Sequence, residues 1–597
     1  MSASALGLGT QAAFGVARSF SGRRWILQKA DDEAVRELAR SSGVSVTLAR
    51  LLASRGVRSD EIADVLNPTL KRLLPEPNSL LDMERAVARA RAAIESGERI
   101  AVFGDYDVDG SCSAAILQGF LSALGNPPRL YIPDRMTEGY GPSAKALLQL
   151  KDEGMGLVIT VDCGATAADA LAAARDAGLD VIILDHHAVE TAPPAFAQVN
   201  PNRQGDMSGL GHLCAAGVTF LFAVALNRAL REAGWYVKKG VAEPDLRGQL
   251  DLVGLATICD VVPLIGVNRA FVRAGLSQMA KHERAGLAAL ASVAKIAPPF
   301  TPYHHGYVLG PRINAGGRVG RCSLGVELLT TRDGTEAEEF ALALDLHNRE
   351  RQAIEKLILE EAVAMAALQD NAPFLYAAKE GWHAGVVGIV AGRLKDRFGK
   401  PSFVAGFEGG MARGSARSVP GIDIGAVVRA AKESGLLLSG GGHAMAAGFS
   451  LTAEQAEPFQ NFLATRFAQD GEALAGAFDL HLDTLVSPAG ATEALVSDIA
   501  QAGPFGAGNP EPVVAATDVR VVFADVVGRD HVRLRLAGGD GARLDAIAFR
   551  AAGQPLGKGL LGSRGKVVHI AGRLKVDDWN GRVRVQLQVE DAAPAAV

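Results

Sequence analysis

The chain has 597 residues, 48% of them hydrophobic, and a formal net charge of −5. This length predicts about four domains of ~150 residues each, and the hydrophobic content excludes an intrinsically disordered chain. There is no apolar run of about 18 residues, so we expect no membrane span. Because the net charge is slightly negative, any nucleic-acid partner would have to be held by local basic patches.

The five cysteines are scattered singly, and none forms a CxxC pair. This spacing argues against a disulfide framework and against a zinc–thiolate site, and it suits a reducing compartment. Residues 1–24 are rich in small side chains and carry their arginines late, an order that is wrong for a secretory signal. We therefore expect a flexible N-terminal tail and a cytoplasmic protein.

Helical and strand patterns follow one another along the chain. Residues 25–75 carry apolar side chains at three-to-four spacing, which predicts an N-terminal helical region. From residue 83, helical patterns of about ten to fifteen residues alternate with short apolar runs, as is typical of a parallel α/β sheet. The runs are RIAVFG (99–104), RLYIPD (129–134), LVITVD (157–162) and DVIILD (180–185).

Acidic side chains gather where these runs end. GDYDVDGSCSA (104–114) contains three closely spaced Asp residues, and a further apolar run, DLVGLATICD (251–260), which we interpret as another strand, also ends on Asp. Ligands of parallel sheets bind outside the carboxyl ends of the strands. An acidic surface turn is the alternative, but it does not explain so many acidic ends in one sheet. The candidate side chains are Asp105, Asp107, Asp109, Asp162, Asp185, His186, His187 and Asp260.

An oxygen-rich site with one or two imidazoles suits Mg²⁺ or Mn²⁺. Four or five carboxylates around a single cation would leave a large excess of negative charge. Two cations ~3.5–4 Å apart balance that charge better and match the two-metal design for phosphoester cleavage. The sequence contains no GxxxxGK[ST], HExxH or GxSxG stretch, so a motor ATPase, a zinc peptidase and a serine hydrolase have no support.

Three different sequence patterns follow one another in the rest of the chain. Residues 335–368 contain neither Gly nor Pro and predict one connecting helix of ~50 Å. A Gly-rich unit follows over residues 369–455, with a Gly-rich entry into a helix near 381–394. From about residue 470, five short strands separated by turns predict a small closed barrel of the OB kind.

The motifs DYDVDG, VDCG, DHH and ICDVVPL, in this order, resemble the DHH phosphoesterase superfamily. GHLCAAGVTF, GPRINAGGR, LHNRERQ, GSARS and GGGHAMAAGF are similar to the RecJ family of single-strand-specific exonucleases, and AGPFGAGNPEPV resembles the linker into the OB domain of that family. The resemblance covers about residues 30–590. It implies an α/β fold with a parallel-sheet DHH domain at 76–334, a smaller α/β DHHA1 domain at 369–455 and an OB domain at 470–597.

The resemblance also implies a role for each candidate side chain. Asp105, Asp107 and Asp162 would hold one Mn²⁺ or Mg²⁺. Asp162 would bridge to a second ion held also by Asp109, His186 and Asp260. Asp185 would orient its neighbours.

His187 would face the scissile phosphate as a hydrogen-bond donor or proton source; the alternative is a packing role. Ser415 and Arg417 would grip a 5′-terminal phosphate, for which the forked guanidinium is suited. Arg318 and His443 would contact further backbone phosphates.

The first hypothesis is therefore a processive 5′→3′ exonuclease that releases 5′-mononucleotides from single-stranded DNA during recombination and repair. We expect a monomer without membrane contact, which works with a single-stranded-DNA-binding protein and a helicase. One alternative is a DHH-type phosphodiesterase of short oligonucleotides or cyclic dinucleotides. Another is a non-catalytic scaffold that binds single-stranded DNA, but such a protein would lose metal ligands, and here every matching position is occupied.

Overall fold

The computed structural model describes residues 11–595, apart from 136, 190, 370–371, 469–477 and 580–581. The chain divides into two compact units, each of which is described by itself. The central unit comprises Asn67–Gln352 with Pro504–Pro510, and the barrel unit comprises Met1–Leu66, Ala353–Gly503 and Glu511–Val597. Among the described residues, no helix has the length and apolar character needed to cross a membrane.

The central unit is built on a five-stranded sheet in the order β3-β2-β4-β5-β6, and every neighbouring pair is parallel. This confirms the predicted parallel sheet. Its inner strands are almost entirely buried, as expected when helices cover both faces. The strands are β2 (Ile100–Gly104), β3 (Arg129–Tyr131), β4 (Leu157–Val161), β5 (Asp180–Leu184) and β6 (Ala197–Val199).

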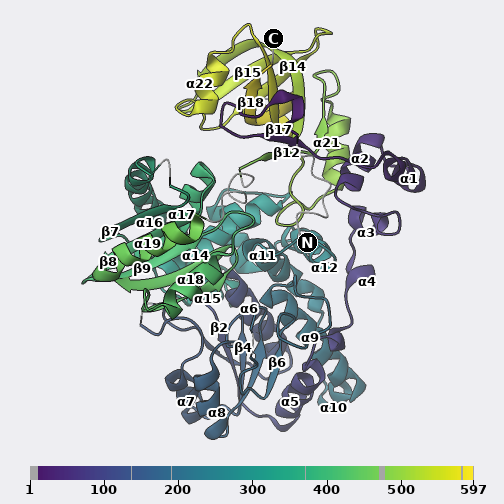
Figure 1. Ribbon diagram of the computed structural model, residues 1–597. Coiled ribbons are helices and arrows are strands. Elements are labelled where there is room, and N and C mark those ends of the chain that lie inside the picture. Colours follow the sequence, from purple (N-terminus) through teal and green to yellow (C-terminus); the bar gives the residue numbers. More distant parts are fainter. Residues whose placement is uncertain are drawn as a thin grey trace. The chain divides into compact units, whose positions relative to one another are not determined.

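Helices cover the two faces of this sheet unequally (Figure 1). One face packs in the large core with α5 (Met83–Ser96), α6 (Val108–Ala123) and α9 (Ala215–Glu232). The other face packs against α7 (Ala144–Asp152) and α8 (Ala168–Asp176). The remaining helices of this unit are α4 (Leu70–Leu73), η3 (Pro77–Ser79), α10 (Trp235–Lys239), η4 (Leu246–Gln249), α11 (Leu250–Cys259), α12 (Val267–Met279), α13 (Ala285–Val293), η5 (His304–Leu309), α14 (Gly310–Val319) and α15 (Leu324–Thr330).

The sheet reverses its direction of winding between β2 and β4. From β2 the chain first adds β3 on one side, and then returns to place β4 on the other side. Asp105 directly follows β2, and Asp162 directly follows β4. The two carboxylates thus lie at the topological switch point, where open α/β sheets bind their ligands.

The interpretation of residues 251–260 as a strand was wrong. This run forms α11, and Asp260 is the residue that ends the helix rather than the end of a strand. An apolar run buried on all sides has neither the strand nor the helix period, so its pattern could not distinguish the two. Asp260 therefore approaches the sheet edge from a helix.

The barrel unit contains a second sheet, in the order β10-β11-β9-β8-β7, in which only β7 and β8 run parallel. The long helix α16 (Gly334–Ala367) leads into it from the central unit. The strands are β7 (Leu375–Glu380), β8 (Ser402–Glu408), β9 (Met411–Arg417), β10 (Ser439–His443) and β11 (Ala446–Thr452). The helices are α17 (Ala384–Phe398), α18 (Ile424–Glu433), η6 (Ala453–Gln455) and α19 (Ala456–Phe467).

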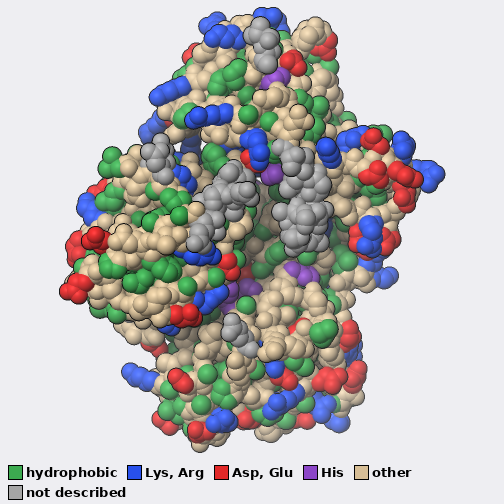
Figure 2. Space-filling view, viewed as in Figure 1, with side chains coloured by type: hydrophobic (Ala, Val, Ile, Leu, Met, Phe, Trp, Pro, Cys, Tyr) green, Lys and Arg blue, Asp and Glu red, His purple; other side chains and the backbone are tan. Residues whose placement is uncertain are grey.

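The C-terminal part forms a closed barrel, as the sequence predicted. Five strands pair in the order β14-β15-β16-β18-β17, and β17 pairs again with β14. In Figure 2, Lys and Arg side chains on the barrel surface are interspersed with Asp and Glu. The elements are β12 (Leu480–Leu482), β13 (Thr484–Leu485), α21 (Glu493–Gln501), β14 (Val514–Val527), β15 (His531–Ala537), β16 (Arg543–Ala548), α22 (Pro555–Leu561), β17 (Val567–Trp579) and β18 (Arg582–Pro594).

Residues 11–24 are packed against this barrel, which differs from the flexible tail expected there; residues 1–10 of that expected tail lie outside the described residues. Among residues 11–24, Val16 is buried, and Phe20 donates its backbone N–H to the carbonyl of Ala592. Trp25 is fully buried and donates its indole N–H to Asp591 at 3.0 Å. The elements of this segment are η2 (Ala13–Gly15), β1 (Trp25–Leu27), which pairs with β12, and the helices α1 (Asp32–Ser42), α2 (Val46–Ser54) and α3 (Ile62–Leu66).

Candidate metal centre and anion site

The loop after β2 is shaped by the start of α6. Asp107 is the N-cap of α6, and its Oδ1 accepts the N–H groups of Asp109 at 2.9 Å and of Gly110 at 3.1 Å. A Cβ at position 110 would lie 2.5 Å from the carbonyl oxygen of Asp105, so only Gly fits there. From α14, Asn314 accepts the N–H of Val108 at 3.1 Å and holds the loop from the other side.

Asp109 is directed away from its own helix and onto the beginning of another. Its two carboxylate oxygens accept the N–H groups of Ala215 at 2.6 Å and of Ala216 at 2.8 Å, which open α9. The first N–H groups of a helix have no partner within the helix and favour a negative charge. This contact gives the GHLCAAG motif a physical role, because that segment supplies the two donors.

Asp162 adopts a left-handed backbone conformation, with φ of 60°. Asp tolerates this region better than most residues, although at some energetic cost, and such residues concentrate at functional sites. Its N–H donates to the carbonyl of Leu184 at 3.0 Å, and its carbonyl accepts the hydroxyl of Tyr140 at 3.0 Å. The turn directs a buried carboxylate toward the candidate site.

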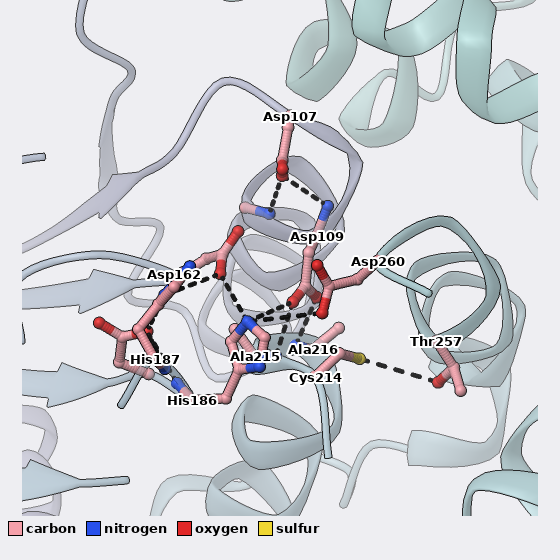
Figure 3. A network of polar contacts seen from close by, with 12 residues as sticks. Asp107, Asp109, Asp162, His186, His187, Cys214, Ala215, Ala216, Thr257 and Asp260 are labelled. Carbon is pink, nitrogen blue, oxygen red and sulfur yellow. Dashed lines mark hydrogen bonds and ion pairs between the residues drawn. The ribbon is translucent and has the colours of Figure 1, made fainter. Parts of the chain in front are cut away.

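His186 joins the carboxylates that come from different elements. In Figure 3 its imidazole lies between Asp162 on one side and Asp109 with Asp260 on the other. Nε2 is 3.4 Å from Asp162 Oδ1, 3.5 Å from Asp260 Oδ2 and 3.8 Å from Asp109 Oδ2. One ring therefore faces the end of β4, the start of α6 and the end of α11.

Asp185 holds the two histidines in place. Its Oδ1 accepts the N–H groups of His186 at 2.7 Å and of His187 at 3.2 Å, and it lies 2.8 Å from His187 Nδ1. Burial opposes ionisation of Asp185, but the hydrogen bonds and charge of His187 prevail and lower its pKa. For His187, burial alone would lower the pKa, whereas its hydrogen bond to Asp185 raises that pKa to about 9.

Four other carboxylates of the site have the opposite electrostatic situation. Burial, followed by repulsion from neighbouring Asp side chains, raises the pKa of Asp105, Asp162 and Asp260 well above the usual range. The same causes raise the pKa of Asp109 to about 7. At neutral pH this cluster is therefore short of positive charge.

The donor set fits divalent cations. Among the described residues, the buried oxygens Asp105 Oδ1 and Asp260 Oδ2 have no hydrogen-bond partner. Three groups bring ligand atoms within 4.8 Å of one another: Asp105 with Asp107 and Asp162, Asp109 with His186 and Asp260, and Asp162 with His186 and His187. Carboxylates with one or two imidazoles form a set typical of Mg²⁺ or Mn²⁺ sites.

Arg318 lies in the last turn of α14, in the same unit as these carboxylates. The neighbouring Gly317 packs closely on the Asp loop, since a Cβ there would lie 3.0 Å from the Tyr106 ring. The helix that carries Arg318 thus supports the loop both through this contact and through Asn314.

Ser415, Arg417 and His443 belong to the barrel unit, where strand register places them on one face of the second sheet. Ala446 of β11 pairs with Arg417 on one side and with His443 on the other. Ser415 lies two residues before Arg417, and its hydroxyl oxygen accepts a hydrogen bond from Arg417 Nη1 at 2.7 Å. Gly448 pairs with Ser415, and a Cβ on Gly448 would meet nothing within 4 Å, so the face beside Ser415 is open.

Arg417 has no acidic partner in any ion pair found among the described residues. Its Nη1 instead donates to Ser415 and to the carbonyl of Ala416, and burial lowers the pKa of the guanidinium. Gly388 of α17 makes room for it, because a Cβ there would lie 3.1 Å from Arg417 Nη2. A largely buried guanidinium without a counter-ion is suited to an anion.

Three contributors to the metal centre were missed by sequence reasoning. They are the hydroxyl of Tyr140, the amide of Asn314 and the backbone N–H groups that open α9. Asn314 and the start of α9 lie within GPRINAGGR and GHLCAAGVTF, so these two motifs marked the segments without revealing what they do. Tyr140, with 51% of its surface exposed, carried no signal in the sequence.

Comparison with known proteins places three family models on the chain: the DHH family, N-terminal domain, at residues 99–246, the DHHA1 domain at 371–469 and the RecJ OB domain at 482–591. The single-stranded-DNA-specific exonuclease RecJ of Escherichia coli is 35% identical, over 92% of this chain and 96% of that protein. RecJ of Bacillus subtilis is 33% identical, over 96% of this chain and 71% of that protein. The crystal structure of Thermus thermophilus RecJ with Mn²⁺ matches with a TM-score of 0.78 and 29% identity, over 95% of this chain and 79% of that chain. The crystal structure of the same protein with Mg²⁺ matches with a TM-score of 0.74 and 27% identity, over 96% of this chain and 79% of that chain.

Proposed function

The chain belongs to the RecJ family of exonucleases, and we propose that it hydrolyses single-stranded DNA from the 5′ end and releases 5′-mononucleotides. The reaction depends on Mn²⁺ or Mg²⁺. The observation that carries this proposal is the cluster of buried carboxylates at the switch point of the central sheet, where carboxylate oxygens lack hydrogen-bond partners. Relatives named for this activity over nearly the whole chain support it.

We assign one cation to Asp105, Asp107 and Asp162, and the second to Asp109, His186, Asp260 and the bridging Asp162. Bound cations would supply a hydroxide nucleophile and neutralise the charge of the phosphoryl oxygens. The chain contributes a rigid frame for this chemistry. Asp107 is fixed by the start of α6, and Asp109 by the start of α9, so neither carboxylate must reorganise when substrate arrives.

His187 is the proton donor of the proposed site. Its Nδ1 faces Asp185 at 2.8 Å, so the proton on Nε2 remains available to an oxygen of the scissile phosphate or of the leaving group. In the metal-free protein the hydrogen bond to Asp185 raises the pKa of the ring to about 9, which favours its protonated form. Asp185 positions the ring and sustains this charge without touching the substrate.

Recognition of the 5′ end is assigned to the second sheet. Arg417 and Ser415 would bind the terminal phosphate on the open face beside Gly448. His443, on the same face, and Arg318, in the central unit, would contact phosphates further along the strand. A phosphate suits Arg417 in particular, because its guanidinium can donate hydrogen bonds to two phosphate oxygens at once.

The cellular setting remains part of the proposal. We place the protein in the cytoplasm as a monomer that acts in DNA recombination and repair, together with a single-stranded-DNA-binding protein and a helicase.

We assign the catalytic DHH domain to residues 76–334, the connecting helix to 335–368, the DHHA1 domain to 369–455 and the OB domain to 470–597.

Digestion of strands labelled at either end tests the function directly. With Mn²⁺, a 5′ label should appear at once in mononucleotides, while a 3′ label should remain on progressively shorter strands, and EDTA should stop both reactions. Duplex DNA of the same sequence serves as the control and should persist. Early release of the 3′ label, or undiminished cleavage in EDTA, would overturn the proposal.

A further inference from the structure

A row of aromatic and imidazole rings lies on the surface of the central unit, outside the metal centre. Tyr303 and Tyr307 are stacked, with ring centroids 5.2 Å apart and ring planes inclined by 20°. Tyr303 also contacts His304, which contacts Phe300, which in turn contacts His282, at centroid distances of 6.3, 6.1 and 5.8 Å. We call these five residues the aromatic row.

The tyrosine end of the row is open to solvent. Tyr303 is 63% exposed and Tyr307 is 73% exposed, whereas Phe300, which contacts His304, is buried. Two stacked rings gain little stability at such exposure, because most of their apolar surface stays in water. Two neighbouring exposed rings offer a flat apolar surface on which another ring can stack.

The row is rigidly connected to a proposed metal ligand. Tyr303 is the N-cap of a single π-helical turn, η5, and Tyr307 lies within that turn, a feature that is frequent at functional sites. This turn packs on α11: a Cβ on Gly306 would lie 3.2 Å from the Ile258 side chain, and Cys259 Sγ lies 3.4 Å from the carbonyl of His305. Asp260 follows directly, so the row and the metal centre share one piece of framework.

Basic side chains accompany the row in the sequence. Residues 285–326 contain no Asp or Glu, but they contain Lys295, Arg312, Arg318 and Arg321. Arg312 is paired with Asp345 and Arg321 with Glu327, so Lys295 and Arg318 are the basic side chains that the proposal uses. The turn η5 continues without a break into α14, which carries Arg318. The segment thus combines exposed rings with basic side chains, which is the pairing that single-strand-binding surfaces use.

We propose that bases of the single-stranded substrate stack on Tyr303 and Tyr307 as the strand passes the metal centre. The inference rests on the proposed function and adds a stretch of the strand's path. Stacking suits this task because every base has a π-face, so the contact tolerates any sequence that must move through it. The half-buried His304 contacts Tyr303 and rests in turn on the buried Phe300.

The test compares substitutions that remove the ring, keep the ring, or keep only apolar bulk. The full-length protein in EDTA is titrated with a ~20-nucleotide strand, longer than a single OB site of ~4–16 nucleotides, and binding is followed by anisotropy. Tyr303→Ala with Tyr307→Ala should weaken binding about five- to a hundred-fold. The matched Tyr→Phe pair should bind nearly as the parent does, and the Tyr→Leu pair should resemble the Ala pair. Val237→Ala, at another exposed apolar position, is the control.

A second measurement reports stacking itself. A strand with one 2-aminopurine, moved base by base from the 5′ end, should show strong quenching at one or two positions, and the Ala pair should relieve it only there. Because both tyrosines are exposed, thermal unfolding should stay unchanged. If the parent neither binds nor cleaves single strands, the proposed function fails. If the parent does both, but the Ala pair binds equally well or the Leu pair equals the Phe pair, the stacking proposal alone is wrong.

Discussion

The carboxylates of the central unit and the arginines of the barrel show charged groups in opposite circumstances. Asp105, Asp109 and Asp162 are at most 5% exposed, and no described Lys or Arg side chain forms an ion pair with them. On the barrel, the side chains of Arg535 and Arg584 are about half exposed, and both face Asp545, at 3.0 and 3.7 Å. Exposed ion pairs contribute little, whereas buried like charges are costly. The first arrangement therefore implies a ligand, and the second requires none.

Arg417 lies between these two cases. It is largely buried like the carboxylates, yet it has the positive sign of the barrel arginines and forms no ion pair among the described side chains. If burial without a counter-ion indicates function, substitutions should impair catalysis or DNA binding most at the Asp cluster, less at Arg417 and least on the barrel.

Loss of Asp162 or Asp107 should have the largest effect. We expect Asp162→Ala and Asp107→Ala each to lower kcat at least about a thousand-fold, because a cation site supplies several kcal/mol of transition-state stabilisation. The fold should persist, as judged by circular dichroism. Asp176→Ala, at an exposed position ending α8, is the matched control and should retain full activity. Near-normal turnover of either variant in saturating Mn²⁺ would contradict the site.

Substitution of Arg417 should alter end recognition more than catalysis. Arg417→Met should weaken the preference for a 5′-phosphate over a 5′-hydroxyl about ten- to a hundred-fold, because a charge-assisted hydrogen bond contributes ~1.5–3 kcal/mol. Competition binding with the two kinds of strand measures this. Arg413→Met, on the same strand but exposed, should keep the preference. A parent protein indifferent to the terminal phosphate would remove this role from Arg417.

Cation binding should stabilise the protein increasingly as pH rises. The folded pKa of Asp109, about 7, is above the unfolded value of ~3.9. Its contribution to the stability of the metal-free protein is therefore complete below about pH 4 and is lost as pH rises through about 7. Cations reverse this loss. The rise in Tm on adding Mn²⁺ should thus be larger at about pH 8 than at about pH 5. An equal rise at both pH values would show that the cluster does not titrate on binding.

Neutralising barrel arginines should have the smallest effect, visible mainly as salt dependence. Arg535, Arg543 and Arg584 line a pocket of about 600 Å³. Their joint replacement by Gln should reduce the slope of log affinity against log salt by at most ~0.7 per lost phosphate contact. Arg564→Gln, at an exposed position away from the pocket, is the control. Unchanged slopes would make the barrel a structural or protein-docking module. Deleting the barrel is a poorer test, because it would expose Trp25.

The sequence by itself determined the parallel sheet and the acidic ends of its strands, because alternation of apolar runs with helical periods is a local property. It also determined the barrel, whose strands are short, regularly spaced and bounded by turns. The ordered motifs identified the family. Asp105 and Asp162 could be placed at one sheet edge from these local patterns alone.

Only the tertiary structure decided how distant segments complete these elements. The buried run 251–260 has no informative period, so packing rather than pattern made it a helix. Asp109 is oriented by the start of α9, more than a hundred residues later, and Trp25 is buried against strands from the other end of the chain. The exposure of Tyr303 and Tyr307 likewise depends on what the rest of the unit leaves uncovered. Burial and long-range hydrogen bonding are properties of the folded chain. A sequence pattern predicts burial only where buried residues recur at the regular spacing of a strand or a helix.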